Sequence, residues 1–241
     1  MKTPVNRFKQ AILNKQVQYG LWVSMGSAYS TEICAGARFD WLLLDCEHAP
    51  NDLQSILMQL QITAAYQDTH PVVRVPVGHG HAGVTLIKQF MDAGATTILV
   101  PMVDTAEQAQ SLVQAMRYPP QGIRGMGTAR AARWGRYTNY TREANEQVCL
   151  LVQAETTTAS ENIDAIAAVD AGRNAGTPLP GARWRVCGSG YRQQFAGATH
   201  QRFVPALQKP CLNLSLSTHR STPHVTHDFQ RRADPQSSRA V

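Results

Sequence analysis

Three side chains suited to chemistry beside a carbonyl group lie within or just after apolar segments of the sequence. Glu155 follows the run VCLLVQA, His48 follows FDWLLLDCE, and Arg74 interrupts PVVRVP. A carboxylate can hold a hard divalent cation, and an imidazole can transfer a proton near neutral pH. A guanidinium in an apolar strand needs an anionic partner, because its burial alone is costly. These residue types favour a reaction that makes or breaks a carbon–carbon bond next to a carbonyl.

Each of these residues also has a purely structural interpretation. Glu155 could form an ion pair or cap a helix. His48 could hydrogen-bond to Asp45 or Glu47 in its own loop. Arg74 could form a fixed salt bridge with either of these two carboxylates, or hold a carboxylate or carbonyl oxygen of a substrate. The sequence leaves both interpretations open for each residue.

Other polar segments carry weaker signals. Asp92, before Ala-Gly in a helical pattern, could be a plain surface or helix-end residue, and Trp22 on the first predicted strand could belong to the core. His79 and His81 lie among glycines and are interpreted as part of a flexible loop. Residues 117–127 (RYPPQGIRGMG) form a rigid turn and a glycine run, suited to closing on an anion or packing on a neighbouring subunit. This segment lacks the order of a dinucleotide fingerprint or a phosphate-binding loop.

The elements that must position these side chains alternate along residues 1–170. The predicted strands are continuous apolar runs, as expected when both faces of a parallel sheet are covered; they are residues 20–24, 39–45, 71–76, 97–103 and 148–155. Two helical stripes lie between them, formed by Leu53, Ile56, Leu57, Leu60 and Ala64 and by Ala109, Leu112, Val113 and Met116. This alternation predicts an α/β fold of the (β/α) barrel type. Such barrels collect their chemistry at the carboxyl ends of the strands, which is where the candidate residues lie.

Length and composition bound the class of protein. The chain has 241 residues, and a single (β/α) barrel typically needs roughly 250. No segment approaches the roughly 18 apolar residues of a membrane span. The amino-terminal residues lack the apolar run of a signal peptide, so we expect a cytoplasmic protein. Five scattered cysteines without CxxC spacing predict reduced thiols, with neither a disulfide framework nor a structural zinc site.

The positive charge is confined to the last third of the chain. Residues 1–170 contain 13 Lys or Arg against 15 Asp or Glu, whereas residues 171–241 contain 10 against 2. Residues 171–241 are also rich in proline and arginine, with only feeble strand signals near 203–207 and 212–216. We therefore predict a partial barrel domain over 1–170, for which no nucleic acid is expected, and an aberrant basic tail over 171–241. Frame-shifted translation is our hypothesis for the tail, and a naturally disordered basic tail is the alternative.

Five segments, taken together and in order, resemble the HpcH/HpaI aldolase family. They are FDWLLLDCEHAPND, PVVRVP, LVPMV, RYPPQGIRGMG and LVQAET, and the resemblance covers about residues 5–170. It implies a (β/α)8 TIM barrel of the phosphoenolpyruvate/pyruvate superfamily type, whose last strands are missing or scrambled in this sequence. It also implies a class II aldolase, which cleaves 4-hydroxy-2-oxo acids to pyruvate and an aldehyde through a metal-stabilised enolate.

The resemblance assigns roles to four of the candidate residues. Glu155 would be a carboxylate ligand of a divalent metal (Mg, Mn or Co), which acts as a Lewis acid toward the 2-oxo acid. His48, paired with Asp92, would form the dyad that handles the proton. Arg74 would hold the oxo oxygen and stabilise the enolate.

The resemblance also implies a pocket, a substrate and an assembly. Gln153 and Trp22 would line the pocket, and Arg124 would contribute to the site or to a subunit interface. The implied substrate is 4-hydroxy-2-oxoheptane-1,7-dioate of homoprotocatechuate degradation, an aromatic catabolic route, cleaved to pyruvate and succinate semialdehyde. 2-Keto-3-deoxy sugar acids are alternative substrates, and a non-catalytic product with a nucleic-acid-binding tail is the alternative function.

One departure from the family concerns the metal and the assembly. The family's second metal carboxylate belongs to a Gly-Pro-Ala-Asp motif, which nothing after Asp170 reproduces. The helix that packs the family's hexamer is also unrecognisable. We therefore expect weakened metal binding and altered subunit packing in this chain.

Overall fold

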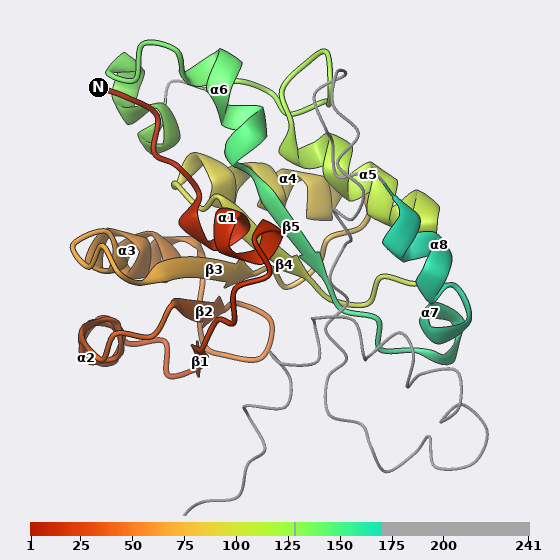
Figure 1. Ribbon diagram of the computed structural model, residues 1–241, viewed down its shortest axis with the longest axis horizontal. Helices are drawn as coiled ribbons and strands as arrows, with labels where there is room; N and C mark the ends of the chain where they lie inside the picture. The colour runs from red at the N-terminus through yellow and green to blue at the C-terminus, as the bar shows by residue number, and fades with distance from the viewer. Residues whose placement is uncertain (128, 170–241) are drawn as a thin grey trace, which may run out of the picture.

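Five parallel strands follow one another around a curved sheet. The computed structural model describes residues 1–127 and 129–169, and Figure 1 colours them along the chain. The strands are β1 (Gly20–Val23), β2 (Trp41–Asp45), β3 (His70–Arg74), β4 (Thr97–Val100) and β5 (Cys149–Val152). They pair in the order β1-β2-β3-β4-β5, and every pair is parallel. This is the sequential strand order of a TIM barrel, so the five predicted strands and the predicted fold class are confirmed. The predicted tail over 171–241 lies outside the described residues.

The first helix precedes β1 and contributes Phe8 to the barrel interior, and the other helices connect strands or follow β5, several of them packing on the outer face of the sheet (Figure 1). The helices are α1 (Arg7–Leu13), α2 (Ala28–Gly36), α3 (Leu53–Thr63), α4 (Gly80–Asp92), α5 (Ala106–Met116), α6 (Tyr140–Gln147), α7 (Thr157–Glu161), α8 (Ile163–Ala168) and a short 3-10 helix, Arg130–Gly135. The two predicted helical stripes are confirmed as α3 and α5. Within the described part of the chain, no helix is long and apolar enough to cross a membrane.

Side-chain caps fix the start of the helices that follow β2 and β4. Asp52 accepts the backbone N–H of Ser55 at 2.8 Å, and the Ser55 hydroxyl accepts the backbone N–H of Asp52 at 2.8 Å. Thr105 and Gln108 form the same reciprocal box at the start of α5. Each box satisfies amide groups that a first helical turn leaves without partners. The loops between strand and helix are thereby held to a defined length.

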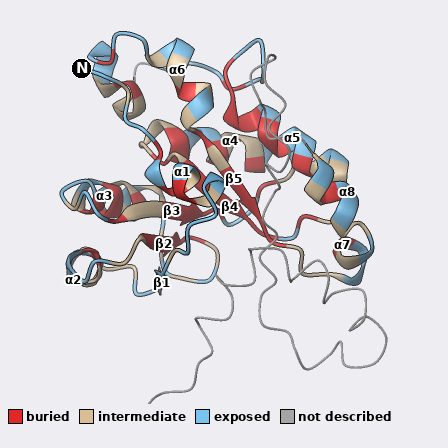
Figure 2. Cartoon of the chain, viewed as in Figure 1, coloured by how far each residue is buried: buried red, intermediate tan, exposed pale blue. Residues whose placement is uncertain are grey.

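Alternate residues of strands β2 to β5 face two different apolar clusters. The outer cluster joins strand and helix side chains, among them Leu42, Leu44, Val73, Ile56, Ile87, Phe90 and Leu112. The inner cluster joins Phe8 of α1 to the inward side chains Trp41, Leu43, Val72, Leu99 and Leu151. Figure 2 shows most of β2, β4 and β5, part of β3 and the sheet-facing sides of several helices as buried. The two-residue period of a strand therefore separates outer core from barrel interior.

The structure corrects the interpretation of residues 78–83 as a flexible loop. His79 is the N-cap of α4, and the four residues after it begin the helix. A Cβ added to Gly83 would lie 2.2 Å from the carbonyl carbon of Gly78, so the glycines allow two backbone segments to pack closely. The hydrophobic residues farther along the segment, including Ile87 and Phe90, are buried and hold the helix on the sheet.

Candidate active site

Charged side chains gather at the carboxyl end of the barrel interior, a region we call the mouth. Its members come from the ends of β1, β2, β3 and β5 and are Trp22, Asp45, Glu47, Arg74, Gln153 and Glu155. Side chains alternate between the two faces of a strand, so Asp45, two residues after the inward Leu43, also points into the barrel. Asp45 lies directly opposite Arg74 in the pairing of β2 with β3. The mouth is where TIM-barrel enzymes place catalytic residues.

Arg74 is the centre of this cluster and binds two carboxylates. Its Nε donates to Asp45 Oδ1 at 2.8 Å, and its NH2 donates to Asp45 Oδ2 at 2.6 Å. Its third nitrogen, NH1, lies 2.7 Å from Glu47 Oε2. The guanidinium carbon also lies 4.8 Å from the centre of the Trp22 ring. The salt bridges that the sequence left open are thus both present, and a role of Arg74 toward substrate stays a prediction.

Asp45 is the most firmly held member of the mouth. Besides the two Arg74 bonds, it accepts the Trp22 ring N–H at 3.2 Å and the backbone N–H groups of Glu47 and His48 at 2.9 and 3.3 Å. Burial alone would raise the pKa of Asp45, but the hydrogen bonds from Arg74 and these donors lower it to about 2. Asp45 therefore remains an anion, and five hydrogen bonds fix its position.

Glu47 is held more loosely than Asp45. Its side chain is 17% exposed, and its Oε2 has the Arg74 ion pair but no hydrogen bond from any described residue. Its Oε1 lies 3.8 Å from His48 Nε2. Burial raises the pKa of Glu47, an effect that the positive charge of Arg74 opposes and the nearby Glu155 reinforces. The mouth therefore contains two carboxylates with different degrees of restraint.

Glu155 lies beyond the end of β5, as the sequence predicted. Its Oε1 accepts the Gln153 side-chain N–H at 3.0 Å, and its Oε2 accepts the Met102 backbone N–H at 3.2 Å. Met102 has a left-handed backbone (φ +56°), a conformation that costs a non-glycine residue on the order of 1–3 kcal/mol. The buried Gln153 Oε1 has no hydrogen-bond partner among the described residues. This oxygen and the Glu155 carboxylate are hard donors of the kind that Mg²⁺ and Mn²⁺ prefer.

His48 lies beside the mouth with an exposed ring. Its side chain is 73% exposed, and its nearest carboxylate oxygen is the Glu47 Oε1 already described. Its backbone N–H, not its ring, reaches Asp45. A proton-transfer role for His48 therefore remains a prediction, carried by its position next to the charged cluster.

Asp92 and Arg124 lie away from the mouth of this chain, so the predicted pairing of His48 with Asp92 stays a prediction. Helix α4 begins near the mouth, where His79 Nε2 contacts the Met102 carbonyl oxygen at 3.0 Å, and runs back for 13 residues. A helix of this length spans about 20 Å, so its last residue, Asp92, reaches the opposite end of the barrel. There Asp92 accepts an Arg124 N–H at 2.7 Å. The pair with His48 does not form within this chain.

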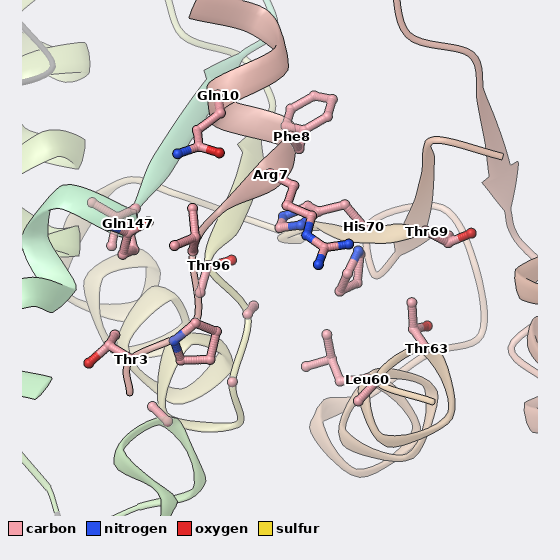
Figure 3. A pocket seen from close by; sticks show the side chains of 18 of the residues that line it. Thr3, Arg7, Phe8, Gln10, Leu60, Thr63, Thr69, His70, Thr96 and Gln147 are labelled. Atoms are coloured by element: carbon pink, nitrogen blue, oxygen red, sulfur yellow. The ribbon is translucent and has the colours of Figure 1, made fainter. Parts of the chain in front are cut away.

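The opposite, amino-terminal end of the barrel, which we call the floor, contains a cavity of about 580 Å³. Figure 3 shows Arg7 and His70 among the side chains that line it, and Arg124 contributes as well. His70 stacks on Phe8 with ring centres 5.7 Å apart, and its Nε2 lies 2.8 Å from Thr97 Oγ1. None of the mouth residues lines this cavity. We assign the candidate active site to the mouth, because that is where charged groups converge on the strand ends.

Sequence reasoning did not include Asp45 and Glu47 among the site residues. It named them only as possible partners of Arg74 and His48, although the signal for their inclusion was present. Leu43 points into the barrel, and every second residue after it is expected to do the same, which gives Asp45 and Glu47. Because strand residues alternate between faces, the same count from Leu151 reaches Gln153 and Glu155. In the part of the chain that the structure describes, no three His, Cys, Asp or Glu side chains converge as a complete metal site.

Comparison with known proteins agrees with this geometry. A family model described as HpcH/HpaI aldolase/citrate lyase matches residues 18–176. The chain is 58% identical, over 170 residues, to a 4-hydroxy-2-oxovalerate aldolase of Rhodococcus jostii, covering 70% of this chain and 64% of that protein. It is 57% identical, over 167 residues, to a hydroxypyruvate/pyruvate aldolase of Deinococcus radiodurans, covering 68% of this chain and 58% of that protein. The chain thus spans less than two thirds of the length of these curated relatives.

A solved structure supports the fold. The chain is similar to an HpcH/HpaI aldolase/citrate lyase family protein from Burkholderia cenocepacia, with a TM-score of 0.65 and 38% sequence identity. The match covers 68% of this chain and 65% of the other.

Proposed function

Because this chain belongs to the HpcH/HpaI aldolase/citrate lyase family, we propose that it is a class II aldolase that cleaves 4-hydroxy-2-oxo acids to pyruvate and an aldehyde. The observation that carries the proposal is the position of Arg74. It is a buried guanidinium at the mouth, held in a fixed orientation by Asp45, with Glu155 at the end of a nearby strand. A donor fixed in this way suits an oxygen on which negative charge develops, because it needs no reorganisation during the reaction.

The cofactor of this proposal is a divalent cation. Glu155 would hold it, and the free Gln153 amide oxygen fits the same hard cation. When bound, the cation would supply Lewis acidity toward the 2-oxo acid. Mg²⁺, Mn²⁺ and Co²⁺ are the candidate ions.

The remaining roles in the reaction would belong to side chains of the protein. Arg74 would donate to the oxo oxygen and stabilise the charge that cleavage places on it. His48, exposed at the rim, would accept the proton of the 4-hydroxyl group near neutral pH. Trp22 and Gln153 would enclose the pyruvate half of the substrate. Asp92 and Arg124, at the floor, take no part in these steps within one chain.

The substrate is the finer part of the proposal. We propose 4-hydroxy-2-oxoheptane-1,7-dioate, which gives pyruvate and succinate semialdehyde. The similarity to a 4-hydroxy-2-oxovalerate aldolase makes 4-hydroxy-2-oxovalerate the second candidate. The two substrates share the 2-oxo acid half, which the mouth residues would bind, and differ only in the aldehyde half.

The test is metal-dependent release of pyruvate by the full-length protein. Pyruvate is measured with either substrate or with a 2-keto-3-deoxy sugar acid, after chelation and again after Mn²⁺ is restored. We expect Glu155→Ala to lower the rate by about 100-fold or more. The control is Glu161→Ala, which removes an exposed carboxylate at the end of α7.

Two results would contradict the proposal. Undiminished pyruvate release after complete removal of metal would exclude the metal-dependent mechanism. Salt-sensitive DNA binding without turnover of any substrate would favour the non-catalytic alternative.

A further inference from the structure

The two carboxylates that neutralise Arg74 differ in how they are attached. Asp45 is 1% exposed and takes two aligned hydrogen bonds from Arg74, at Nε and NH2. Three more donors, described above, hold the same carboxylate. Glu47 touches Arg74 through one oxygen only, at NH1, without hydrogen-bond alignment. Bidentate pairs of the first kind are the stronger and more directional.

The weakly attached carboxylate lies at the nitrogen of Arg74 that Asp45 leaves uncovered. Asp45 covers the edge of the guanidinium formed by Nε and NH2, which leaves NH1 as the nitrogen outside the Asp45 pair. Glu47 Oε2 lies 2.7 Å from that nitrogen. An anionic 2-oxo acid that takes a hydrogen bond from NH1 would therefore meet a carboxylate of its own sign at the same nitrogen. Like charges at such a distance repel, so the two cannot share NH1 without cost.

The Glu47 carboxylate also has an alternative partner beside it. Its second oxygen lies 3.8 Å from the ring Nε2 of His48, whose side chain is largely exposed. A small rotation of the Glu47 side chain toward that ring would release NH1. Asp45 has no comparable freedom, because every move would break several hydrogen bonds in a buried site.

We propose that Glu47 is an exchangeable partner of Arg74, which neutralises NH1 in the empty site and yields this position to the 2-oxo acid, whereas Asp45 stays bound throughout. Glu47 is thus a positioning residue that acts through Arg74. The inference rests on the proposed function, since the ligand is the 2-oxo acid of that reaction. It explains why a guanidinium that is already neutralised by two carboxylates can still bind an anion.

The test compares Glu47→Gln with Asp45→Asn in the full-length protein. Each variant replaces one of the two carboxylates beside Arg74 by a neutral amide of the same length. Oxalate, a planar dianion that resembles the pyruvate enolate and is not cleaved, is titrated calorimetrically in the presence of Mn²⁺. We expect Glu47→Gln to bind oxalate about threefold or more tightly than the unchanged protein, because the competing charge is gone. We expect Asp45→Asn to bind it about tenfold or more weakly, because Arg74 loses its aligned partner.

The opposite sign of the two effects is the decisive feature. A general charge effect would strengthen oxalate binding in both variants, and two fixed structural partners would weaken it in both. Either result would overturn the proposal. Glu47→Ala, which also removes the charge, is expected to match Glu47→Gln and replaces it if the glutamine variant does not fold.

A second measurement separates this inference from the proposed function. The urea midpoint of the ligand-free protein is expected to fall clearly in Asp45→Asn and little in Glu47→Gln, and it needs neither metal nor substrate. If the unchanged protein neither binds oxalate nor releases pyruvate, the proposed function fails, and the midpoints still rank the two partners. Equal falls of the midpoint would show that Glu47 is as firmly fixed as Asp45, and would overturn the proposal.

Discussion

The mouth and the floor of the barrel are built from inward positions of the same strands, but they contain opposite kinds of polar group. On β2 and β3, Trp41 faces His70 at the floor, and Asp45 faces Arg74 at the mouth. The two levels are four residues apart, which is about 13 Å along a strand. At these inward strand positions the floor pairs neutral groups and stacks aromatic rings, whereas the mouth concentrates charges. The charged residues of the floor, among them Arg7 and Arg124, come from outside the strands.

This difference indicates what each end contributes. At the floor, Thr97 Oγ1 accepts from Asn6 Nδ2 at 3.0 Å and contacts His70, under the ring of Phe8. Neutral groups with satisfied hydrogen bonds add stability at little electrostatic cost. At the mouth, charges are buried together although an apolar filling would be cheaper. Polar groups that stability does not require are expected where a ligand will bind.

The largest expected effect tests the charged end. Arg74→Ala should lower pyruvate release by about 100- to 1,000-fold, since it removes the donor to the developing charge. Arg74→Lys should recover little, because an ammonium group cannot donate bidentately to Asp45. The measurement is the steady-state rate of pyruvate release, with Arg142→Ala, at an exposed position, as the control. A lysine variant with the unchanged rate would mean that a point charge at the mouth is sufficient.

The next prediction concerns the floor. Phe8→Ala should lower the free energy of unfolding by about 3–5 kcal/mol, because Phe8 fills the inner cluster and stacks on His70. The control on the same helix is Leu13→Ala, at a position that is 50% exposed, with an expected cost below about 1 kcal/mol. Urea unfolding measures both. The rate of the folded Phe8 variant should be unchanged, and a specific loss of rate would remove the functional separation between the two ends.

The floor and the mouth should contribute to stability in different pH ranges, which can be measured without an activity assay. Burial lowers the pKa of His70 to about 4, below its ordinary value of 6.5, so protonation favours the unfolded chain. The stability that depends on neutral His70 is present above pH 6.5 and is lost as the pH falls toward 4, with a slope of up to about 1.4 kcal/mol per pH unit. The contribution of Asp45 is present above pH 3.8 and is lost as the pH falls through about 2.

The measurement is the urea midpoint as a function of pH. His70→Gln should flatten the curve between pH 6.5 and 4 and leave the decline below pH 4 in place. If this variant keeps the slope above pH 4, another group carries the pH dependence and the comparison of the ends loses this support.

The smallest expected effect concerns Trp22. Trp22→Phe removes the N–H that donates to Asp45 at 3.2 Å but keeps an aromatic ring beside Arg74. Pyruvate release should fall by less than about tenfold, since one of five hydrogen bonds to Asp45 is lost. Trp22→Ala should lower it further, because it also removes the ring. Equal losses in the two variants would assign the whole effect to the hydrogen bond.

The sequence predicted the periodic elements of this protein well, and it predicted their spatial relations only in part. The five apolar runs were sufficient for the strands, because a buried parallel strand needs a continuous apolar segment. The predicted ends were too long, as in 97–103 against Thr97–Val100, since apolar Pro101 and Val103 in the loop after the strand are also buried. The glycine-rich start of α4 was missed, because close packing of Gly83 on Gly78 is a tertiary contact with no local signal.

For the site, the sequence by itself determined which chemical groups stand at the strand ends, among them Arg74, Glu155 and His48. It determined these because strand ends and residue types are local properties of the chain. Only the tertiary structure decided that Asp45 and Glu47 share Arg74, and that Asp92 lies at the far end of the barrel with Arg124. These relations depend on the register between strands and on the direction in which each helix returns. Both are set by packing between segments far apart in the sequence, which no local pattern records.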